Sequence, residues 1–266
     1  MKLRLLLPLL LVACGGTSDA PDAGDAGIDQ YGHKSFDAAT VHDAHEEEAA
    51  VVKVPWDRMT SHGGIVIASP KIRVLYVGLT KNSDALVSWI VSSSKYWPIL
   101  AQYGVGPGEY LGSTTIDQDA FFQPNDIQGG YVGVSTLGWR IHQAITALPP
   151  DEAGGVANAW VVFLPGGVNV DLGEGKTCQW ALGYHWTNGA EPYSVIPNCG
   201  SSGWTVSHEI AEMVTDPTGG GWYSNDDFQN AGGEIGDLCN FPVTVEGNVV
   251  SALWSNADGD CEPYSE

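Results

Sequence analysis

The chain has 266 residues, of which 43% are hydrophobic, so it is long enough to bury one sizeable core. Its 32 acidic residues outnumber its 11 lysines and arginines, which gives a formal net charge of −21 at pH 7. This charge repels nucleic acid and anionic lipid headgroups, and therefore excludes a protein that binds either through a basic surface. It favours an exposed, soluble protein that can hold cations.

Residues 1–13 are predicted to be an export signal. Lys2 and Arg4 give it a basic start, and the apolar run from Leu5 to Val12 is too short to span a bilayer. The run ends in L-V-A-C, which resembles the cleavage box of bacterial lipoproteins. That resemblance implies cleavage before Cys14 and a lipid on Cys14, whereas a plain signal peptide with a chance cysteine is the alternative. We therefore expect an extracytoplasmic protein anchored to a bacterial membrane, with the outer membrane or cell surface favoured by Gly15.

Residues 14–50 are predicted to be a disordered acidic tether between the lipid and the folded domain. They are rich in Asp, Ala and Gly and contain few large apolar residues, so they cannot bury enough surface to fold. His42, His45 and the run Glu46–Glu48 are interpreted as a solvated charged stretch. The folded domain is expected over residues 51–266.

The folded domain is predicted to interleave strands with helices. In chain order we expect a strand at Lys71–Gly78, a helix over Ser83–Tyr103 with a break at Pro98, a strand at Tyr110–Thr115, a helix at Leu137–Leu148, strands at Ala157–Leu164 and Tyr193–Ile196, a helix at Thr205–Thr215, and strands at Val243–Val245 and Val249–Trp254. This order predicts a single domain of the α/β or α+β class, with one mixed sheet and helices packed on it.

The predicted helix at Thr205–Thr215 contains the strongest functional motif, S-H-E-I-A-E-M-V-T-D-P. It resembles the zincin motif H-E-x-x-H with glutamate in place of the second histidine. Residues four apart share one face of a helix, so His208 and Glu212 can bind the same metal. Zinc accepts carboxylate oxygen in catalytic sites, and Glu209 is then placed to act as a general base. The carboxylate ligand also admits harder cations such as calcium.

Carboxylates and a histidine elsewhere in the chain are candidates for the third metal ligand. The segment G-G-E-I-G-D-L-C offers Glu234 and Asp237 beside Cys239, and L-G-Y-H-W offers His185. We favour Asp237, followed by Glu234 and His185, because a disulfide at Cys239 would hold a neighbouring ligand still. Asp216 is interpreted as a cap of its own turn before Pro217. The alternative for the whole motif is an ordinary amphipathic helix.

Four cysteines remain if Cys14 carries lipid, and an even number in an exported chain predicts disulfides. Of the three possible pairings, proximity in sequence favours Cys178 with Cys199 and Cys239 with Cys261. A four-thiolate zinc site is the alternative, but no C-x-x-C pair supports it.

The segment from Ser207 to Cys239 resembles a group of bacterial secreted proteins that share the pattern S-H-E-x-x-E-x-x-T-D-P followed by E-I-G-D-x-C. Three further motifs fit the same group: S-H-G-G at Ser61–Gly64, Y-W-P-I-L-A-Q-Y-G-V at Tyr96–Val105 and C-Q-W-A-L-G-Y-H at Cys178–His185. The resemblance covers the domain from about Ser61 to Cys261 and implies a zincin-like active-site helix.

A more distant resemblance is to the plant exordium (phosphate-induced) proteins, which are secreted into the cell wall. They share the H-G-G start and have T-N-P-F where this chain has Thr215, Asp216 and Pro217. They lack the residues corresponding to His208, Glu209 and Glu212. This resemblance therefore implies a fold that does not itself require a catalytic metal.

Two functions are consistent with these patterns. The first is a lipid-anchored, zinc-dependent hydrolase, most simply a peptidase, that acts through a metal-activated water on a peptide or cell-wall substrate. The second is a non-catalytic surface or wall-associated module with a structural cation such as calcium. The single imidazole of the motif favours zinc and hence the first function. An interaction protein without metal is a third, weaker hypothesis.

Overall fold

The computed structural model describes residues 58–148, 157–173, 175–188, 191–200, 203–224 and 233–263. The predicted signal peptide, lipidated Cys14 and the acidic tether of residues 14–50 lie outside the described residues, as does the predicted start of the domain at residue 51. The described part has the predicted mixed content of helices and strands in a single domain of the α+β kind.

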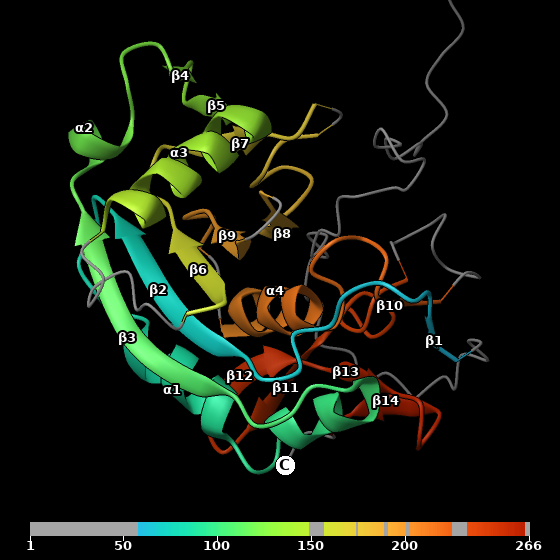
Figure 1. The fold of residues 1–266 in the computed structure, drawn as a ribbon. Helices are drawn as coiled ribbons and strands as arrows, with labels where there is room; N and C mark the ends of the chain where they lie inside the picture. The colour runs from blue at the N-terminus through green and yellow to red at the C-terminus, as the bar shows by residue number, and fades with distance from the viewer. Residues whose placement is uncertain are drawn as a thin grey trace, which may run out of the picture.

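A five-stranded mixed sheet forms the centre of the domain (Figure 1). Its order is β3 (Glu109–Ile116), β2 (Lys71–Val77), β6 (Ala159–Phe163), β9 (Pro192–Ile196) and β8 (Tyr184–Thr187). The first four strands are parallel, and β8 pairs antiparallel with β9 at one edge. Four of these strands were predicted, whereas β8 was not.

Helices cover both faces of this sheet, because alternate residues of its strands point to opposite sides. In β2, Val74 and Tyr76 join the core that contains α1 (Asp84–Ser92) and α4 (Gly203–Thr215). Leu75 and Val77 join the core that contains α3 (Val134–Ala147). The sheet thereby separates the α4 side, which carries the predicted metal motif, from the α3 side.

The helix predicted over Ser83–Tyr103 is in fact two elements. The α-helix α1 ends at Ser92, and the 3₁₀ helix η1 (Trp97–Tyr103) follows with Pro98 in its first turn. A proline is tolerated there because the first N–H groups of a helix have no partner inside it. Pro98 therefore lies in the first turn of the second element, and the break in the predicted helix comes before that element.

Most of the elements that were not predicted have only two to four residues, and period-2 patterns cannot identify segments so short. They are β1 (Thr60–Ser61), α2 (Gln118–Phe121), β4 (Ile127–Gln128), β5 (Tyr131–Gly133), β7 (Asn169–Asp171), β10 (Trp222–Tyr223) and β14 (Asp260–Glu262). The predicted C-terminal strands are β11 (Pro242–Val245), β12 (Asn248–Ser251) and β13 (Leu253–Ser255). Ala252 separates β12 from β13, so the strand predicted over Val249–Trp254 is two.

Both disulfides join the cysteines that proximity favoured. Cys178 bonds to Cys199 and Cys239 bonds to Cys261, with Cα–Cα distances of 5.0 and 5.7 Å. Structural disulfides are typical of proteins in oxidising compartments. Among the described residues, no helix has the length and hydropathy that a membrane span requires.

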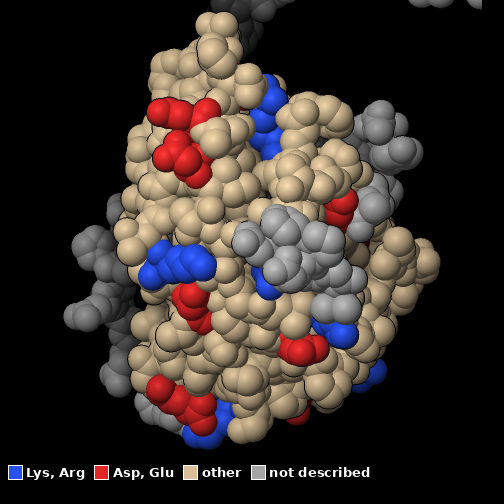
Figure 2. Space-filling model, turned by 60° about the vertical axis from the view of Figure 1, so that its left-hand side comes forward, with Lys and Arg blue, Asp and Glu red and all other residues tan. Residues whose placement is uncertain are grey.

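The negative charge of the chain does not gather into one patch on the face that Figure 2 shows. Basic and acidic side chains are scattered there in small groups over a mostly uncharged surface. Lys71 lies 3.9 Å from Glu109, and Arg140 forms a closer ion pair, 2.6 Å, with Asp126.

The motif S-H-G-G packs against the glycines that follow α4. The backbone N–H of Gly64 donates to the carbonyl of Gly220 at 2.6 Å, and β1 pairs with β10. The ring of His62 stacks on Tyr223 with centroids 3.5 Å apart. This motif is thus explained by close backbone packing, since a Cβ on Gly64 would lie only 2.2 Å from the Gly220 oxygen.

We predict that Gly64→Ala destabilises the domain by about 1–3 kcal/mol, the usual cost of forcing atoms into a packed site. Gly220→Ala is the matched control, because the nearest atom to its added Cβ is 3.9 Å away. Denaturant unfolding of both variants tests this. Equal midpoints for the two variants would show that the 61–64 segment does not need this close approach.

Candidate metal centre

Helix α4 is buried on all sides, with every residue from Thr205 to Thr215 in the interior. It packs against β8 and β9 of the sheet on one side and against β12 on another. Ile210, Met213 and Val214 face the core, as predicted. A helix in this position buries its polar side chains together with its apolar ones, so each buried polar group needs a partner.

The predicted helix caps are wrong, because α4 begins at Gly203 and both Thr205 and Ser207 lie inside it. The hydroxyl of Ser207 instead donates to the carbonyl of Trp204, at 2.9 Å, and accepts from the backbone N–H of Ser251 at 2.8 Å. Ser207 thus fixes β12 against the helix, one residue before the histidine of the motif.

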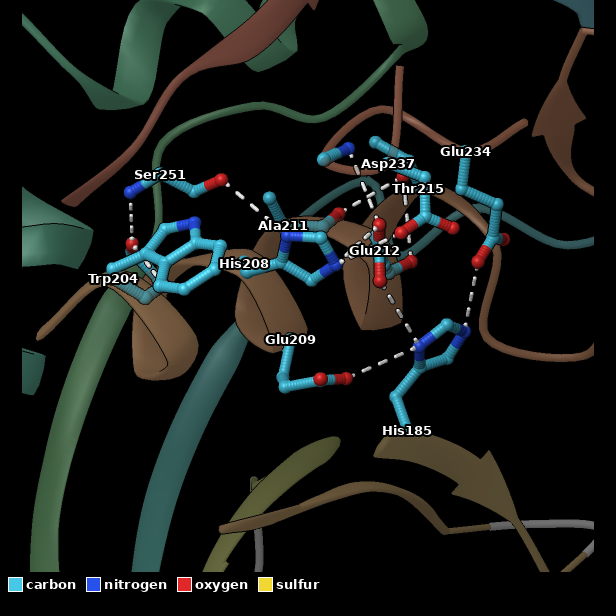
Figure 3. A network of polar contacts seen from close by, with 12 residues as sticks. His185, Trp204, His208, Glu209, Ala211, Glu212, Thr215, Glu234, Asp237 and Ser251 are labelled. Carbon is cyan, nitrogen blue, oxygen red and sulfur yellow. Dashed lines mark hydrogen bonds and ion pairs between the residues drawn. The ribbon is translucent and has the colours of Figure 1, made fainter. Parts of the chain in front are cut away.

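His208 and Glu212 lie one helical turn apart and meet as the motif predicted (Figure 3). The Nε2 atom of His208 is 3.0 Å from Oε1 of Glu212, and both side chains are fully buried. The backbone N–H of Gly236 donates to the same Oε1 at 3.2 Å. These contacts hold one carboxylate oxygen and one imidazole nitrogen close together.

Asp237 comes to this pair from the turn between β10 and β11. Its Oδ1 lies 3.3 Å from His208 Nε2. Backbone hydrogen bonds from Leu238 to Glu234 and from Asn240 to Gly236 shape the turn, and the disulfide at Cys239 ties it to β14. Ligand atoms of His208, Glu212 and Asp237 all lie within 4.8 Å of one another, so the three residues can hold a metal ion.

His185 reaches α4 from the edge strand β8. Its neighbours Tyr184 and Trp186 pack on the α3 side, so alternation along the strand turns His185 towards α4. Its Nδ1 lies 3.7 Å from Oε2 of Glu209 and 3.7 Å from Oε2 of Glu212. These three residues form a second group that can hold a metal ion, with ligand atoms within 4.8 Å of one another.

Each histidine has its other ring nitrogen near a second polar group. His185 Nε2 lies 3.5 Å from Oε2 of Glu234, and His208 Nδ1 lies 3.4 Å from Oγ of Ser251. The Ser251 hydroxyl donates to the carbonyl of Ala252 at 3.0 Å, so it is left to accept from His208 Nδ1. Neutral His208 then presents an unprotonated Nε2 to two carboxylates, so either a proton on that nitrogen or a metal cation is needed to compensate them.

Glu209 is a buried carboxylate of the centre without hydrogen bonds to its oxygens. It is 0% exposed, and neither of its oxygens has a hydrogen-bond partner among the described residues. Gly183 makes room for it, since a Cβ there would lie 2.8 Å from Glu209 Oε1. A carboxylate buried without partners is costly unless a cation or a proton compensates it.

Burial raises the pKa of Glu209 to about 7, and the negative charge of Glu212 adds to this while His185 and His208 oppose it. For His208, burial lowers the pKa, but Glu212 and Asp237 outweigh it and raise the pKa well above its ordinary value. All of these residues come from the segment after Lys176, and that segment contains no lysine or arginine. The local field therefore strongly favours a positive charge beside His208 Nε2.

The structure thus brings together all the residues that the motif and its neighbours suggested: His185, His208, Glu209, Glu212, Glu234 and Asp237. Asp216 lies apart and accepts hydrogen bonds from the N–H groups of Gly220 and Gly221, both at 2.7 Å, so it fixes the turn after Pro217, whereas it was expected to cap the turn before Pro217. Sequence reasoning missed Ser251, Gly183 and Gly236. The two glycines lie in the motifs L-G-Y-H and E-I-G-D. Their position next to candidate ligands is the sequence signal that could have indicated a role in the centre.

Comparison with known proteins identifies no relative. No protein-family model matches the chain, and searches of curated proteins and of solved structures find no match. The resemblances to bacterial secreted proteins and to exordium proteins therefore stay predictions, and the centre is interpreted from its own geometry.

We predict that Gly236→Ala weakens metal binding about 10- to 100-fold, as changes to groups that orient metal ligands do. The added Cβ would lie 2.6 Å from His208 Nδ1 and 2.8 Å from Glu212 Oε1, so both side chains must move. Zinc titration with a competing chelator measures the change, with Gly220→Ala as the control. Unchanged affinity in Gly236→Ala would place the bound ion away from His208 and Glu212.

Proposed function

We propose that the protein is an exported, lipid-anchored metal-dependent hydrolase, of which a zinc peptidase is the simplest form. The observation that carries the proposal is the convergence of His208 Nε2, Glu212 Oε1 and Asp237 Oδ1 near the carboxylate of Glu209, whose oxygens have no hydrogen-bond partner among the described residues. Three protein ligands are the number that catalytic zinc sites have, and imidazole nitrogen and carboxylate oxygen are both zinc ligands. Glu209 follows the first ligand directly, as the general base does in H-E-x-x-H enzymes.

A divalent cation at this place would polarise a scissile carbonyl and acidify a water. Glu209 would accept the proton of that attacking water and pass it to the leaving amine. A pKa of about 7 suits a group that must both take up and release a proton near neutral pH.

The ligand types favour zinc over calcium. Two imidazoles, those of His185 and His208, stand among the candidate ligand atoms. Calcium takes six to eight oxygen ligands, whereas imidazole suits zinc and other transition metals. Zinc is therefore the proposed cofactor, and a peptide or cell-wall component the proposed substrate.

A bacterial membrane is a proposed partner, to which a lipid on Cys14 would anchor the N-terminal segment. We predict that Cys14→Ser abolishes incorporation of labelled fatty acid and moves the protein from the membrane fraction to the soluble exported fraction. Both disulfides should still form, because their cysteines are in the folded domain. A Cys14→Ser protein that still incorporates labelled lipid would contradict the proposed anchor.

Glu209→Gln tests the catalytic role. We expect it to lower the rate of hydrolysis about 100- to 10,000-fold, the usual contribution of a positioned general base. The cation held by His208, Glu212 and Asp237 and the unfolding temperature should both be retained. The measurement is turnover on a peptide library with metal content determined in parallel.

Two further variants serve as references in this assay. His208→Ala should lose both the cation and the activity. Glu191→Gln removes a carboxylate that pairs with His142 at 2.7 Å, outside the centre, and should keep both. A Glu209→Gln protein with wild-type turnover would refute the role of Glu209, and no hydrolysis of any peptide by the metal-loaded wild type would refute the peptidase.

The complete burial of the ligands favours a second candidate, a surface module with a structural cation. His208, Glu209 and Glu212 are 0% exposed, as expected of a closed shell of ligands. In that case removal of the metal would lower the unfolding temperature, and no substrate would be turned over. The same metal and turnover measurements distinguish this function from the hydrolase.

A further inference from the structure

The two groups of candidate ligands share one residue, Glu212, through different oxygens. Its Oε1 faces His208 Nε2, at 3.0 Å, in the group with Asp237. Its Oε2 faces His185 Nδ1, at 3.7 Å, in the group with Glu209. Figure 3 shows the Glu212 carboxylate between the two imidazole rings. A carboxylate placed in this way can bind one cation through each oxygen.

The two groups are built alike. Each has one imidazole nitrogen directed at the shared carboxylate, and each imidazole has a polar group at its other nitrogen: Ser251 for His208 and Glu234 for His185. Metal-binding histidines characteristically have their second nitrogen held by such a hydroxyl, carbonyl or carboxylate. By this similarity, Glu234 is the residue that orients His185. The sequence analysis had instead suggested Glu234 as a direct metal ligand.

Glu209 gives an independent reason to place a cation in the second group. It is fully buried, and neither of its oxygens has a hydrogen-bond partner in the described part of the chain. A cation held by His208, Glu212 and Asp237 leaves this carboxylate uncompensated. A cation beside its Oε2 and His185 Nδ1 would satisfy it directly.

The number of buried carboxylates is also consistent with two divalent ions. Glu209, Glu212, Glu234 and Asp237 are all at most 4% exposed, and together they carry four negative charges when ionised. The segment after Lys176, which supplies all four carboxylates, contains no lysine or arginine of its own. Two divalent cations carry as many positive charges as these four carboxylates carry negative ones.

We propose that the centre binds two divalent transition-metal cations bridged by Glu212. His208, Glu212 and Asp237 hold the first ion, and His185, Glu209 and Glu212 hold the second. This inference rests on the metal site of the proposed function and changes one role in it, because Glu209 is a ligand and not the general base when the second ion is bound. It does not depend on the nature of the substrate.

The first test is the number of zinc ions bound by the full-length protein. The protein is saturated with Zn²⁺, passed through a desalting column to remove weakly held ions, and analysed by elemental mass spectrometry. We expect about two zinc ions per chain. One ion per chain would overturn the two-ion proposal and leave the proposed hydrolase standing, whereas none would overturn both.

Two variants assign the second ion to its group. His185→Ala should bind about one zinc, and Gly183→Ala, which keeps every ligand but displaces the Glu209 carboxylate, should weaken the second ion at least about tenfold. The matched control is His142→Ala, which removes a histidine that pairs with Glu191 outside the centre and should still bind two ions. Two ions bound with wild-type affinity in both His185→Ala and Gly183→Ala would place the second ion elsewhere and overturn the proposal.

The bridge itself is tested with Mn²⁺. Ions that share a carboxylate lie about 3.5–4 Å apart in two-metal sites, close enough for their electron spins to couple. We expect the protein with two Mn²⁺ to give an exchange-coupled electron paramagnetic resonance spectrum, and Glu212→Gln to lose it. Two uncoupled Mn²⁺ signals in the wild type would show separate sites and exclude the bridge.

Discussion

The burial of negative charge around α4 is the constraint on which the rest of the domain depends. Glu209 and Glu212 have no exposed surface, and Asp237 and Glu234 approach them from a turn distant in sequence. Carboxylates are rarely buried in this way, because removing them from water costs several kcal/mol each unless an opposite charge compensates them. The surrounding structure is therefore best understood as the framework that keeps these side chains together, close enough to hold a metal ion.

That framework fixes α4 from three directions. Alternation in β8 turns His185 towards the helix, Ser207 joins the helix to β12, and the turn that carries Asp237 is tied to β14 by a disulfide. Gly183 and Gly236 leave the space that the carboxylates and the imidazole of His208 occupy. The ligands therefore come from rigid elements and a braced turn, which is the arrangement that holds a metal site to its geometry.

The sequence predicted what depends on local periodicity and chemistry. The buried strand at β6, the helix α4 and the pairing of its residues four apart follow from spacing, and both disulfides follow from proximity. The strand β8 was missed because four residues are too few to show a period, although it carries His185. The joint approach of His185 and Asp237 to Glu212 could not be predicted, because it depends on tertiary packing of segments separated by many residues.

The two disulfides also bear on when the centre is completed. One closes the loop from Cys178 to Cys199, which contains His185, and the other closes the loop from Cys239 to Cys261, which contains Ser251 and begins beside Asp237. Every ligand-bearing segment outside α4 is thus held by a bond that forms in an oxidising compartment. If the chain is exported and binds metal as proposed, it would acquire the ion only after leaving the reducing cytoplasm. The metal ions available outside the cytoplasm, and not the cytoplasmic pool, would then decide which ion the protein carries.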